Sequence, residues 1–335
     1  MDVIPQPPSP WDLRADDFPI EGTNRAKLGF LIRYALLAPS TRNTQPWSFA
    51  IGPDEVEIHL DTTRWQRVAD TDQREMFISL GCALENLLIA ATHFGYRTAA
   101  DYLSGVDDET PVVRVRFEGA GRLPASLPDP RFKVMTHRHT HHGTYDGAPV
   151  EAEHLAALCD ACTEPGLRVH WITSDDGRAE VDALVMRADA ILLSNPEYRH
   201  ELGELIGTGV FGTPWLLATL SRFAVSHLMP ASSYAKADHK ALMSSPVIGV
   251  ICAQANSHQA QVRVGQVLER IYLAATTLGL SLQPVSQLLQ LQETAEAVAR
   301  MLPHQACVPL QPFRLGHASP PRVHSPRRSL EEVLR

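Results

Sequence analysis

Several features that mark particular classes of protein are scarce or missing from this chain. Five cysteines among 335 residues are too few for a disulfide framework, so a reducing, cytoplasmic location is expected. No apolar run reaches about 18 residues, the length that a membrane-spanning helix needs, so no membrane partner is expected. Residues 1–10 lack the basic start and apolar core of a secretory signal. A net charge of −8 argues against a nucleic-acid partner, because such proteins usually carry basic patches.

The composition that remains is that of a globular chain with a large core. Hydrophobic residues make up 44% and charged residues 20%, and the length suggests roughly two domains. Four prolines within the first ten residues predict a loose N-terminal arm over 1–24. A second proline cluster, over 124–130, places a domain boundary near its end. The first unit is therefore expected over 25–130 and the second over 131–335.

The first unit opens with a helix and a polar turn. An apolar segment over 28–37 predicts a helix that Pro39 ends, because the residue before a proline disfavours helical backbone. Alternating residues over 47–51 and 56–60 predict two strands. Between helix and strand, the turn gathers more hydroxyl and amide groups than a connection alone requires, which indicates a binding loop with the sequence Ser40-Thr41-Arg42-Asn43-Thr44-Gln45.

The second half of the sequence repeats part of the first. Residues 81–95 and 265–279 are identical at seven of fifteen positions, all at an offset of 265 − 81 = 184. Each segment belongs to a long helix, predicted over 75–94 and 262–278. A helix that is apolar on nearly all sides is buried, so these two are expected in the centre of the protein, each ended by the glycine that closes its segment.

A weaker match locates an insertion in the second half. The helix before Pro39 matches residues 153–165 at an offset of 126. The two offsets differ by 184 − 126 = 58, so the second half should hold an insertion of about that length. Residues 196–246 have no counterpart in the first half and are the expected insertion. Their glycines and the apolar segment 215–229 predict a lid that lies over apolar surface.

The loop from Leu36 to Phe49 resembles the flavin-contacting loop of the nitroreductase superfamily of FMN enzymes. The duplication resembles the Acg-type branch of that superfamily, in which two nitroreductase-like units are fused as an internal pseudo-dimer. The resemblance extends over most of residues 25–335. It implies an α+β fold with two related units, each a small mixed sheet with helices, around the two central helices. It also implies a monomer that mimics a homodimer, with its FMN site between the halves.

Further motifs resemble the cofactor contacts of the superfamily. The run His137-Arg138-His139-Thr140-His141-His142 is similar to an Arg-x-Ser/Thr-x-basic pattern that holds the FMN phosphate, and a guanidinium with neutral donors suits a dianion. The basic C-terminal tail would complete that site. The resemblance assigns the phosphate to Arg138, Thr140, His142 and either Arg327 or Arg328, the ring or ribityl chain to Pro39, Ser40, Thr41 and Asn43, the surroundings of flavin N5 to Pro284, Val285 and Ser286, and the pyrimidine edge to Arg263.

The two halves complement each other in these motifs. The first half has Asp12 where Arg138 would lie, and the second half has no Asn-Thr-Gln-Pro-Trp loop. One complete FMN site per chain is therefore expected. No side chain is expected to act as a catalytic acid or base, because the flavin performs the chemistry.

Three other patterns offer alternative interpretations. His137, His139, His141 and His142 could ligate a metal, although no cysteine or carboxylate cluster accompanies them. Residues 207–212 satisfy the G-x-G-x-x-G string, but they follow a helical stretch instead of a strand and fit a hinge better than a nucleotide loop. A lone C-x-x-C at 159–162 is more typical of helix packing than of redox chemistry.

Two functions of different kind follow from the resemblance. The leading hypothesis is an FMN-dependent oxidoreductase of nitroreductase type, which passes hydride from NAD(P)H to a small electron acceptor in a ping-pong cycle. The alternative is a flavin-storage protein whose lid closes over the cofactor and allows little turnover. A metal-binding protein that uses the histidine run is the remaining possibility.

Overall fold

Two four-stranded sheets arrange their strands in the same order. The computed structural model describes residues 9–119, 129–208, 239–303, 307–319 and 324–335. Within them the strand order is β1-β2-β4-β3 in one sheet and β5-β6-β8-β7 in the other, with every strand pair antiparallel. The α+β class is thus confirmed and the repeated order is consistent with two related units. Among the described residues, parallel pairing, which a mixed sheet requires, is limited to isolated bridges of Phe49 with Leu334 and of Thr140 with Leu282. The strands are β1 (Trp47–Ile51), β2 (Glu55–Leu60), β3 (Arg97–Tyr102), β4 (Val113–Glu118), β5 (Leu167–Ile172), β6 (Val247–Ala253), β7 (Leu280–Pro284) and β8 (Val308–His317).

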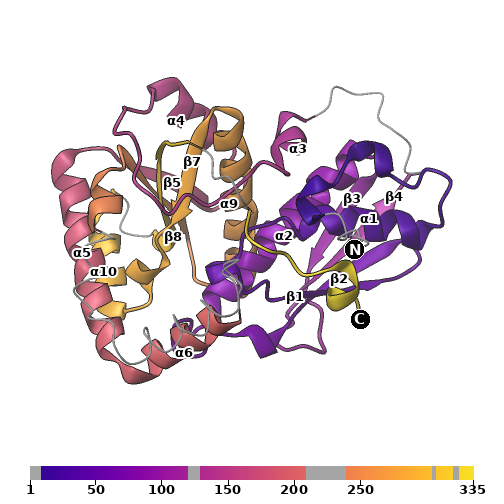
Figure 1. The fold of residues 1–335 in the computed structure, drawn as a ribbon, viewed down its shortest axis with the longest axis horizontal. Coiled ribbons are helices and arrows are strands. Elements are labelled where there is room, and N and C mark those ends of the chain that lie inside the picture. The colour runs from indigo at the N-terminus through magenta and orange to yellow at the C-terminus, as the bar shows by residue number, and fades with distance from the viewer. Residues whose placement is uncertain (1–8, 120–128, 209–238, 304–306, 320–323) are drawn as a thin grey trace, which may run out of the picture.

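Helices lie between and around the sheets (Figure 1). The helix predicted over 28–37 ends before Pro39, as expected from its proline. The first unit contains η1 (Pro10–Asp12), η2 (Ala15–Asp17), α1 (Asn24–Ala35), η3 (Thr41–Asn43), η4 (Thr62–Arg64) and α2 (Arg74–His93). The rest of the chain contains α3 (Pro130–Val134), α4 (Ala152–Cys159), α5 (Asp175–Ser194), α6 (Pro196–Gly207), α9 (His258–Thr277), η6 (Ser286–Leu289), α10 (Gln292–Met301) and α11 (Leu330–Val333).

Helices α2 and α9 cross at the centre of the molecule with their backbones in contact (Figure 1). A Cβ added at Gly81 would lie 2.0 Å from the carbonyl oxygen of Val262, and one at Gly265 would lie 2.0 Å from that of Ile78. The two glycines are equivalent in the repeat, so the contact is symmetric. Helix α2 is long and apolar enough to pass for a membrane span, but 83% of that window is buried in the protein. Its apolar surface is therefore used by the core.

The segment without a counterpart in the first unit begins earlier than expected. A three-residue turn, 52–54, joins β1 to β2, whereas residues 173–246 separate the equivalent strands β5 and β6. The insertion thus includes α5 as well as the predicted 196–246. The sequence repeat could not reveal this, because α5 has the pattern of an ordinary helix. Most of the predicted lid, including 215–229, lies outside the described residues.

Both ends of the chain pack onto the folded units. The described part of the arm, 9–24, is anchored instead of loose: η1 begins at Pro10, a position that suits proline, and the side chain of Phe18 is buried in the core. At the other end the backbone N–H of Arg335 donates to the carbonyl of Phe49 in β1, at 2.9 Å. The tail therefore leaves the second sheet and returns to the first unit, as the yellow segment of Figure 1 shows.

Candidate functional site

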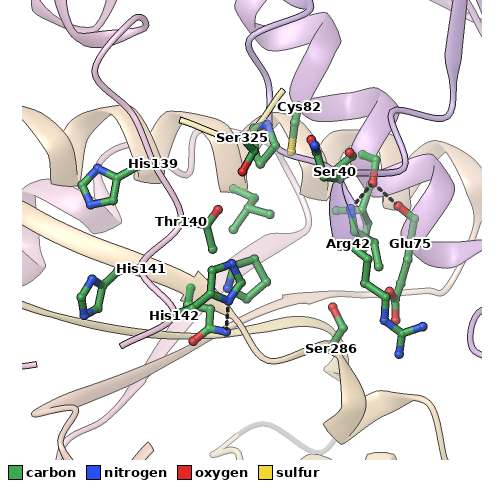
Figure 2. A pocket seen from close by; sticks show the side chains of 18 of the residues that line it. Ser40, Arg42, Glu75, Cys82, His139, Thr140, His141, His142, Ser286 and Ser325 are labelled. Carbon is green, nitrogen blue, oxygen red and sulfur yellow. Dashed lines mark hydrogen bonds between the residues drawn. The ribbon is translucent and has the colours of Figure 1, made fainter. Parts of the chain in front are cut away.

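A cavity of about 730 Å³ opens between the two units (Figure 2). This volume lies within the range of small-molecule and cofactor sites. The polar loop and α2 of the first unit form one side, and residues of the histidine run, of β7 and of η6 form the other. Ten of the thirteen residues that the resemblance assigned to FMN line it: Pro39, Ser40, Thr41, Asn43, Arg138, Thr140, His142, Pro284, Ser286 and Arg327.

The polar loop has an unusual backbone. Arg42, Asn43 and Gln45 have φ values of 50°, 58° and 51°, in the left-handed region that non-glycine residues seldom occupy. Local hydrogen bonds hold the loop there: Ser40 Oγ accepts from the N–H of Gln45 at 2.9 Å, and the N–H of Thr41 donates to Ser79 Oγ at 3.1 Å. Strained backbone that is fixed in this way is typical of binding sites.

Two arginines from distant parts of the chain meet beside this loop. Arg138, which is 1% exposed, and Arg327 each donate an Nη2–H to the carbonyl oxygen of Leu37 at 3.2 Å. Among the described residues, Arg138 Nε and Nη1 and Arg327 Nε have no hydrogen-bond partner. Burial and the charge of Arg138 lower the pKa of Arg327 to about 9. Two adjacent cations with unsatisfied donors form a site that an anion would stabilise.

Aromatic rings hold both guanidinium groups. The Trp11 ring centre is 4.6 Å from the guanidinium carbon of Arg327 and 6.0 Å from that of Arg138, and the Tyr272 ring is 4.9 Å from the latter. The His324 ring stacks on the Trp11 ring, with 4.2 Å between the two ring centres. Sequence reasoning missed Trp11, whose only signal was a tryptophan within a proline-rich segment.

A buried carboxyl group lies behind the arginines. Glu269 is fully buried, and neither carboxyl oxygen has a hydrogen-bond partner among the described residues. Arg138 Nε is 3.7 Å from Glu269 Oε1. Burial raises the pKa of Glu269 to about 8, although Arg138 opposes the shift. The sequence signal that could have found Glu269 is its equivalence to Glu85, which is identical in the repeat.

Two side chains of the histidine run, His139 and His142, have a lowered pKa. Burial lowers the pKa of His142, so it does not supply the positive charge of the basic residue in the family pattern. Its Nδ1 lies 3.0 Å from Gln283 Nε2, and Thr140 Oγ1 accepts from the Tyr272 hydroxyl at 2.8 Å. In Figure 2 the rings of His139 and His141 lie apart from that of His142. The only set of three or more metal-ligating side chains found in the described chain lies elsewhere.

Residues that follow β7 reach the cavity in part. Pro284 and Ser286 line it, but Val285 is 4% exposed and packs in an apolar cluster. Its N–H donates to the carbonyl of Pro312 at 2.9 Å, so this amide is already used. The structure therefore does not bring Val285 to the cavity lining, although its neighbours Pro284 and Ser286 reach it. Ser286 begins η6.

Two predicted arginines lie outside the cavity lining. The guanidinium of Arg263 is 4.9 Å from the ring centre of Tyr102. Arg328 Nη1 donates to the carbonyls of Gln45 and Trp47 and to Asp61, so it fastens the tail to the first unit. Of the two tail arginines, the structure brings Arg327 to the cavity, and Asn43 holds it there through a 2.8 Å hydrogen bond from Arg327 Nη1 to Asn43 Oδ1.

The insertion reaches the cavity through α6. Tyr198 and Leu202 line it, and the Tyr198 hydroxyl accepts a hydrogen bond from Arg42, whose guanidinium also lies 5.0 Å from the Tyr198 ring centre. Gln66 Oε1 accepts from Arg42 Nη1 at 3.1 Å. The strained loop and the insertion therefore meet at this end of the cavity. Sequence reasoning assigned no role to Arg42.

Known proteins of similar sequence cover nearly the whole chain. No protein-family model matches it. It is 24% identical over 333 residues to a Mycobacterium tuberculosis H37Rv protein named "Putative NAD(P)H nitroreductase Rv3131", covering 95% of this chain and 92% of that one. It is 25% identical over 321 residues to the "Putative NAD(P)H nitroreductase acg" of the same organism, covering 90% and 93%.

Solved structures show a more distant likeness. The FMN-dependent nitroreductase NfnB from Mycobacterium smegmatis, in complex with NADPH, has 18% identity and a TM-score of 0.42, covering 59% of this chain and 93% of that one. A nitroreductase with bound FMN from Desulfitobacterium hafniense has 16% identity and a TM-score of 0.40, covering 62% and 97%.

Proposed function

This chain belongs to the nitroreductase superfamily, and we propose that it binds one FMN in the cavity between its two units and passes hydride from NAD(P)H to a small electron acceptor. The observation that carries the proposal is a pair of arginines with unsatisfied N–H groups, the buried Arg138 and the half-buried Arg327. When bound, the flavin supplies hydride acceptance and donation, and the protein supplies position and electrostatics.

The arginine pair fits the phosphate of FMN. A phosphate group brings nearly two negative charges and several strong acceptor oxygens near neutral pH. The open donors on Arg138 and Arg327 would form charge-assisted hydrogen bonds to it, each worth about 1.5–3 kcal/mol. A phosphate bound between the guanidinium groups of Arg138 and Arg327 would also reduce the repulsion between these two positive charges.

The strained loop fits the polar body of the cofactor. Ser40 and Thr41 line the cavity at a loop whose shape is held by hydrogen bonds within the protein. Preformed donors and acceptors bind tightly because less conformational entropy is lost. Across the cavity, Ser286 opens a 3₁₀ turn, where the first backbone N–H groups have no partner within the helix. We assign these residues to the ribityl chain and the ring system.

The chain would act as a monomer, because both sides of the cavity come from one polypeptide, and its few cysteines would suit the cytoplasm. The first unit supplies the loop, and the second unit supplies the arginine of the histidine run. The C-terminal tail then returns to the first unit and brings the other arginine. A second copy of the chain adds nothing that this site requires.

A storage function has one observation in its favour. Arg42 and Tyr198 already join the loop to the insertion at one end of the cavity, which would restrict access to a bound flavin. If this contact stays closed, the flavin is bound but does not turn over. If α6 moves away from the loop, donor and acceptor can enter in turn, since lids of this kind often control turnover.

The test combines cofactor content with reduction. Purified protein should show a flavin spectrum and release one FMN per chain on denaturation. Rapid bleaching of the flavin by anaerobic NAD(P)H would establish the oxidoreductase, and full occupancy with no bleaching would establish storage. Two flavins per chain, or none after incubation with excess FMN, would contradict the proposed site. A variant with Tyr198→Phe, which removes only the hydroxyl that accepts from Arg42, should be reduced faster if the contact restricts access.

A further inference from the structure

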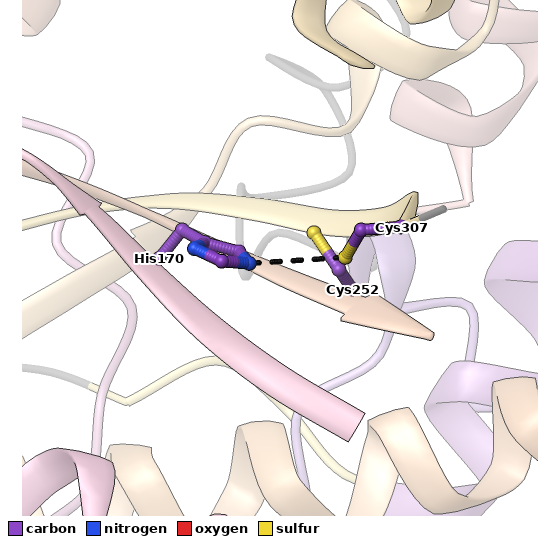
Figure 3. Close-up of side chains that lie close together, drawn as sticks. All are labelled: His170, Cys252 and Cys307. Atoms are coloured by element: carbon purple, nitrogen blue, oxygen red, sulfur yellow. Dashed lines mark hydrogen bonds between the residues drawn. The ribbon is translucent and has the colours of Figure 1, made fainter. Parts of the chain in front are cut away.

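A group of three metal-ligating side chains lies in the second sheet, away from the flavin cavity. His170 of β5, Cys252 of β6 and Cys307 just before β8 each offer a ligand atom, and these atoms lie within 4.8 Å of one another (Figure 3). Cys307 Sγ is 3.8 Å from His170 Nε2. None of the three lines the cavity between the units.

The sheet register explains why they meet. His170 pairs with Val250, and Cys252 lies two residues further along β6, so both side chains project from the same face. Between Ile251 and Cys252 the pairing of β6 with β8 shifts by one residue. A bulge of this kind re-aims side chains. This shift in the β6–β8 pairing lies beside Cys252, where Cys307 approaches it. The Cys307 side chain therefore meets those of His170 and Cys252 at the bulge.

The spacing and chemistry suit zinc. Zinc binds cysteine sulfur at about 2.3 Å and histidine nitrogen at about 2.0–2.1 Å in tetrahedral geometry, which places a sulfur and a nitrogen ligand about 3.6 Å apart. The observed Sγ to Nε2 distance is 3.8 Å. Two thiolates would neutralise a divalent ion, and thiolate with imidazole selects soft or borderline metals over magnesium and calcium.

We propose that His170, Cys252 and Cys307 form a zinc site with water as the fourth ligand. Cys252 is buried in the apolar cluster that also contains Val181 and Val298, while His170 and Cys307 are half-buried and give the ion a route from solvent. The ion would tie β5, β6 and β8 together at the sheet from which the long insertion departs.

The first experiment measures zinc affinity in the flavin-loaded protein by competition with a chromophoric chelator. We expect one zinc per chain, and binding weakened about tenfold or more in Cys307→Ser and in His170→Gln. The matched control is Cys159→Ser, because Cys159 accepts a hydrogen bond from Trp171 Nε1 at 3.0 Å and a serine hydroxyl can replace it. This control should bind zinc as the native chain does. Equal affinity in all four proteins, or no binding by the native chain, would overturn the proposal.

A second experiment needs no variant. Zinc should protect Cys307 from alkylation in the native protein, measured by peptide mass spectrometry, and leave the reactivity of half-buried Cys162 unchanged. Equal alkylation of Cys307 with and without zinc, or a Cys252–Cys307 disulfide in protein kept under thiol, would contradict the metal site. Neither readout depends on flavin, so failure here leaves the proposed FMN site untouched.

Discussion

The surroundings of two equivalent glutamates differ, although the central helices α2 and α9 that carry them repeat each other. We call the surroundings of Glu85 the filled end of the helix pair and those of Glu269 the open end. Glu85 and Glu269 are equivalent at the offset of 184, and both are buried. Glu85 accepts hydrogen bonds from Arg270 Nε at 2.7 Å and from Gln266 at 3.1 Å. Glu269 has no hydrogen bond of normal geometry among the described residues; Asn86, at the position equivalent to Arg270, interacts with its carboxyl group, and Arg138 Nε lies 3.7 Å from Oε1. One end of the pair is thus internally satisfied, and the other is left open.

At the filled end, protein side chains occupy the place that a ligand would take at the open end. Arg270 occupies the position equivalent to Asn86, and it donates to Glu85, to Glu164 and to the carbonyl of Ala161. Burial alone would lower the pKa of Arg270, but the two carboxylates outweigh it and raise that pKa. At the open end, Arg138 contacts the carbonyl of Leu37 in a similar way but has no carboxylate hydrogen-bonded to it. We infer that the Glu164 carboxylate takes the place of the anion that the open end would bind.

The largest effect is expected at the crossing that both ends share. Gly81→Val places a side chain against the Val262 carbonyl, which a Cβ would already approach to 2.0 Å, so α2 and α9 must separate. We expect the free energy of unfolding to fall by about 3 kcal/mol or more, with loss of soluble protein. Thermal denaturation measures it. Gly29→Ala in α1 is the control, since its Cβ would meet its nearest neighbour at 3.5 Å. Similar melting temperatures for both variants would contradict the close crossing.

Replacing Glu85 and Glu269 in turn by glutamine compares how much each carboxyl group contributes to the free energy of unfolding. Glu85→Gln breaks a buried ion pair and leaves Arg270 partly unpaired, so the free energy of unfolding should fall by about 3 kcal/mol. Glu269→Gln removes a carboxyl group that burial keeps mostly protonated at pH 7, so the change should be less than about 1 kcal/mol. Chemical denaturation at pH 7 compares the two variants. Equal losses would mean that the ends do not differ as described.

Removing the open arginine should affect the cofactor more than the fold. Arg138→Ala deletes charge-assisted hydrogen bonds to phosphate worth roughly 1.5–3 kcal/mol, which corresponds to about tenfold to a hundredfold weaker FMN binding. Flavin fluorescence titration measures the affinity, and circular dichroism checks the fold. Arg263→Ala is the control, because Arg263 stacks on Tyr102 outside the cavity. Undiminished FMN binding by Arg138→Ala would place the phosphate elsewhere.

Local patterns predicted much of this site, and long-range packing set the rest. The strand 47–51 and the polar loop were recognisable because their patterns lie within a few residues. The arginine of the histidine run was recognisable from its motif. Trp11 and Glu269 were missed, because each contacts Arg138 from a position that is distant in the sequence. Val285 and Arg263 do not line the cavity, since spacing along a chain does not determine which way a side chain points.

The smallest effect is a pH dependence that belongs to the open end alone. The folded-state pKa of Glu269, about 8, lies above its ordinary value of 4.5, so its contribution to stability is fully present below pH 4.5 and is lost as pH rises through 8. An ionised Glu269 would also neutralise Arg138 and repel a phosphate. FMN affinity should therefore fall severalfold between pH 7 and pH 8.5, where the phosphate itself no longer titrates because its second pKa is about 6.

The variant Glu269→Gln tests whether the ionisation of Glu269 causes this fall in FMN affinity. The variant should keep its FMN affinity up to pH 8.5, because it has no carboxyl group to ionise at position 269. Glu85→Gln, at the filled end, should retain the native profile, because Glu85 is already paired with Arg270. Dissociation constants measured at half-unit steps of pH compare the three proteins. A native profile that stays flat to pH 8.5, or one that Glu269→Gln leaves unchanged, would show that this buried carboxyl does not sense the phosphate. The open end would then bind its anion through the two arginines alone.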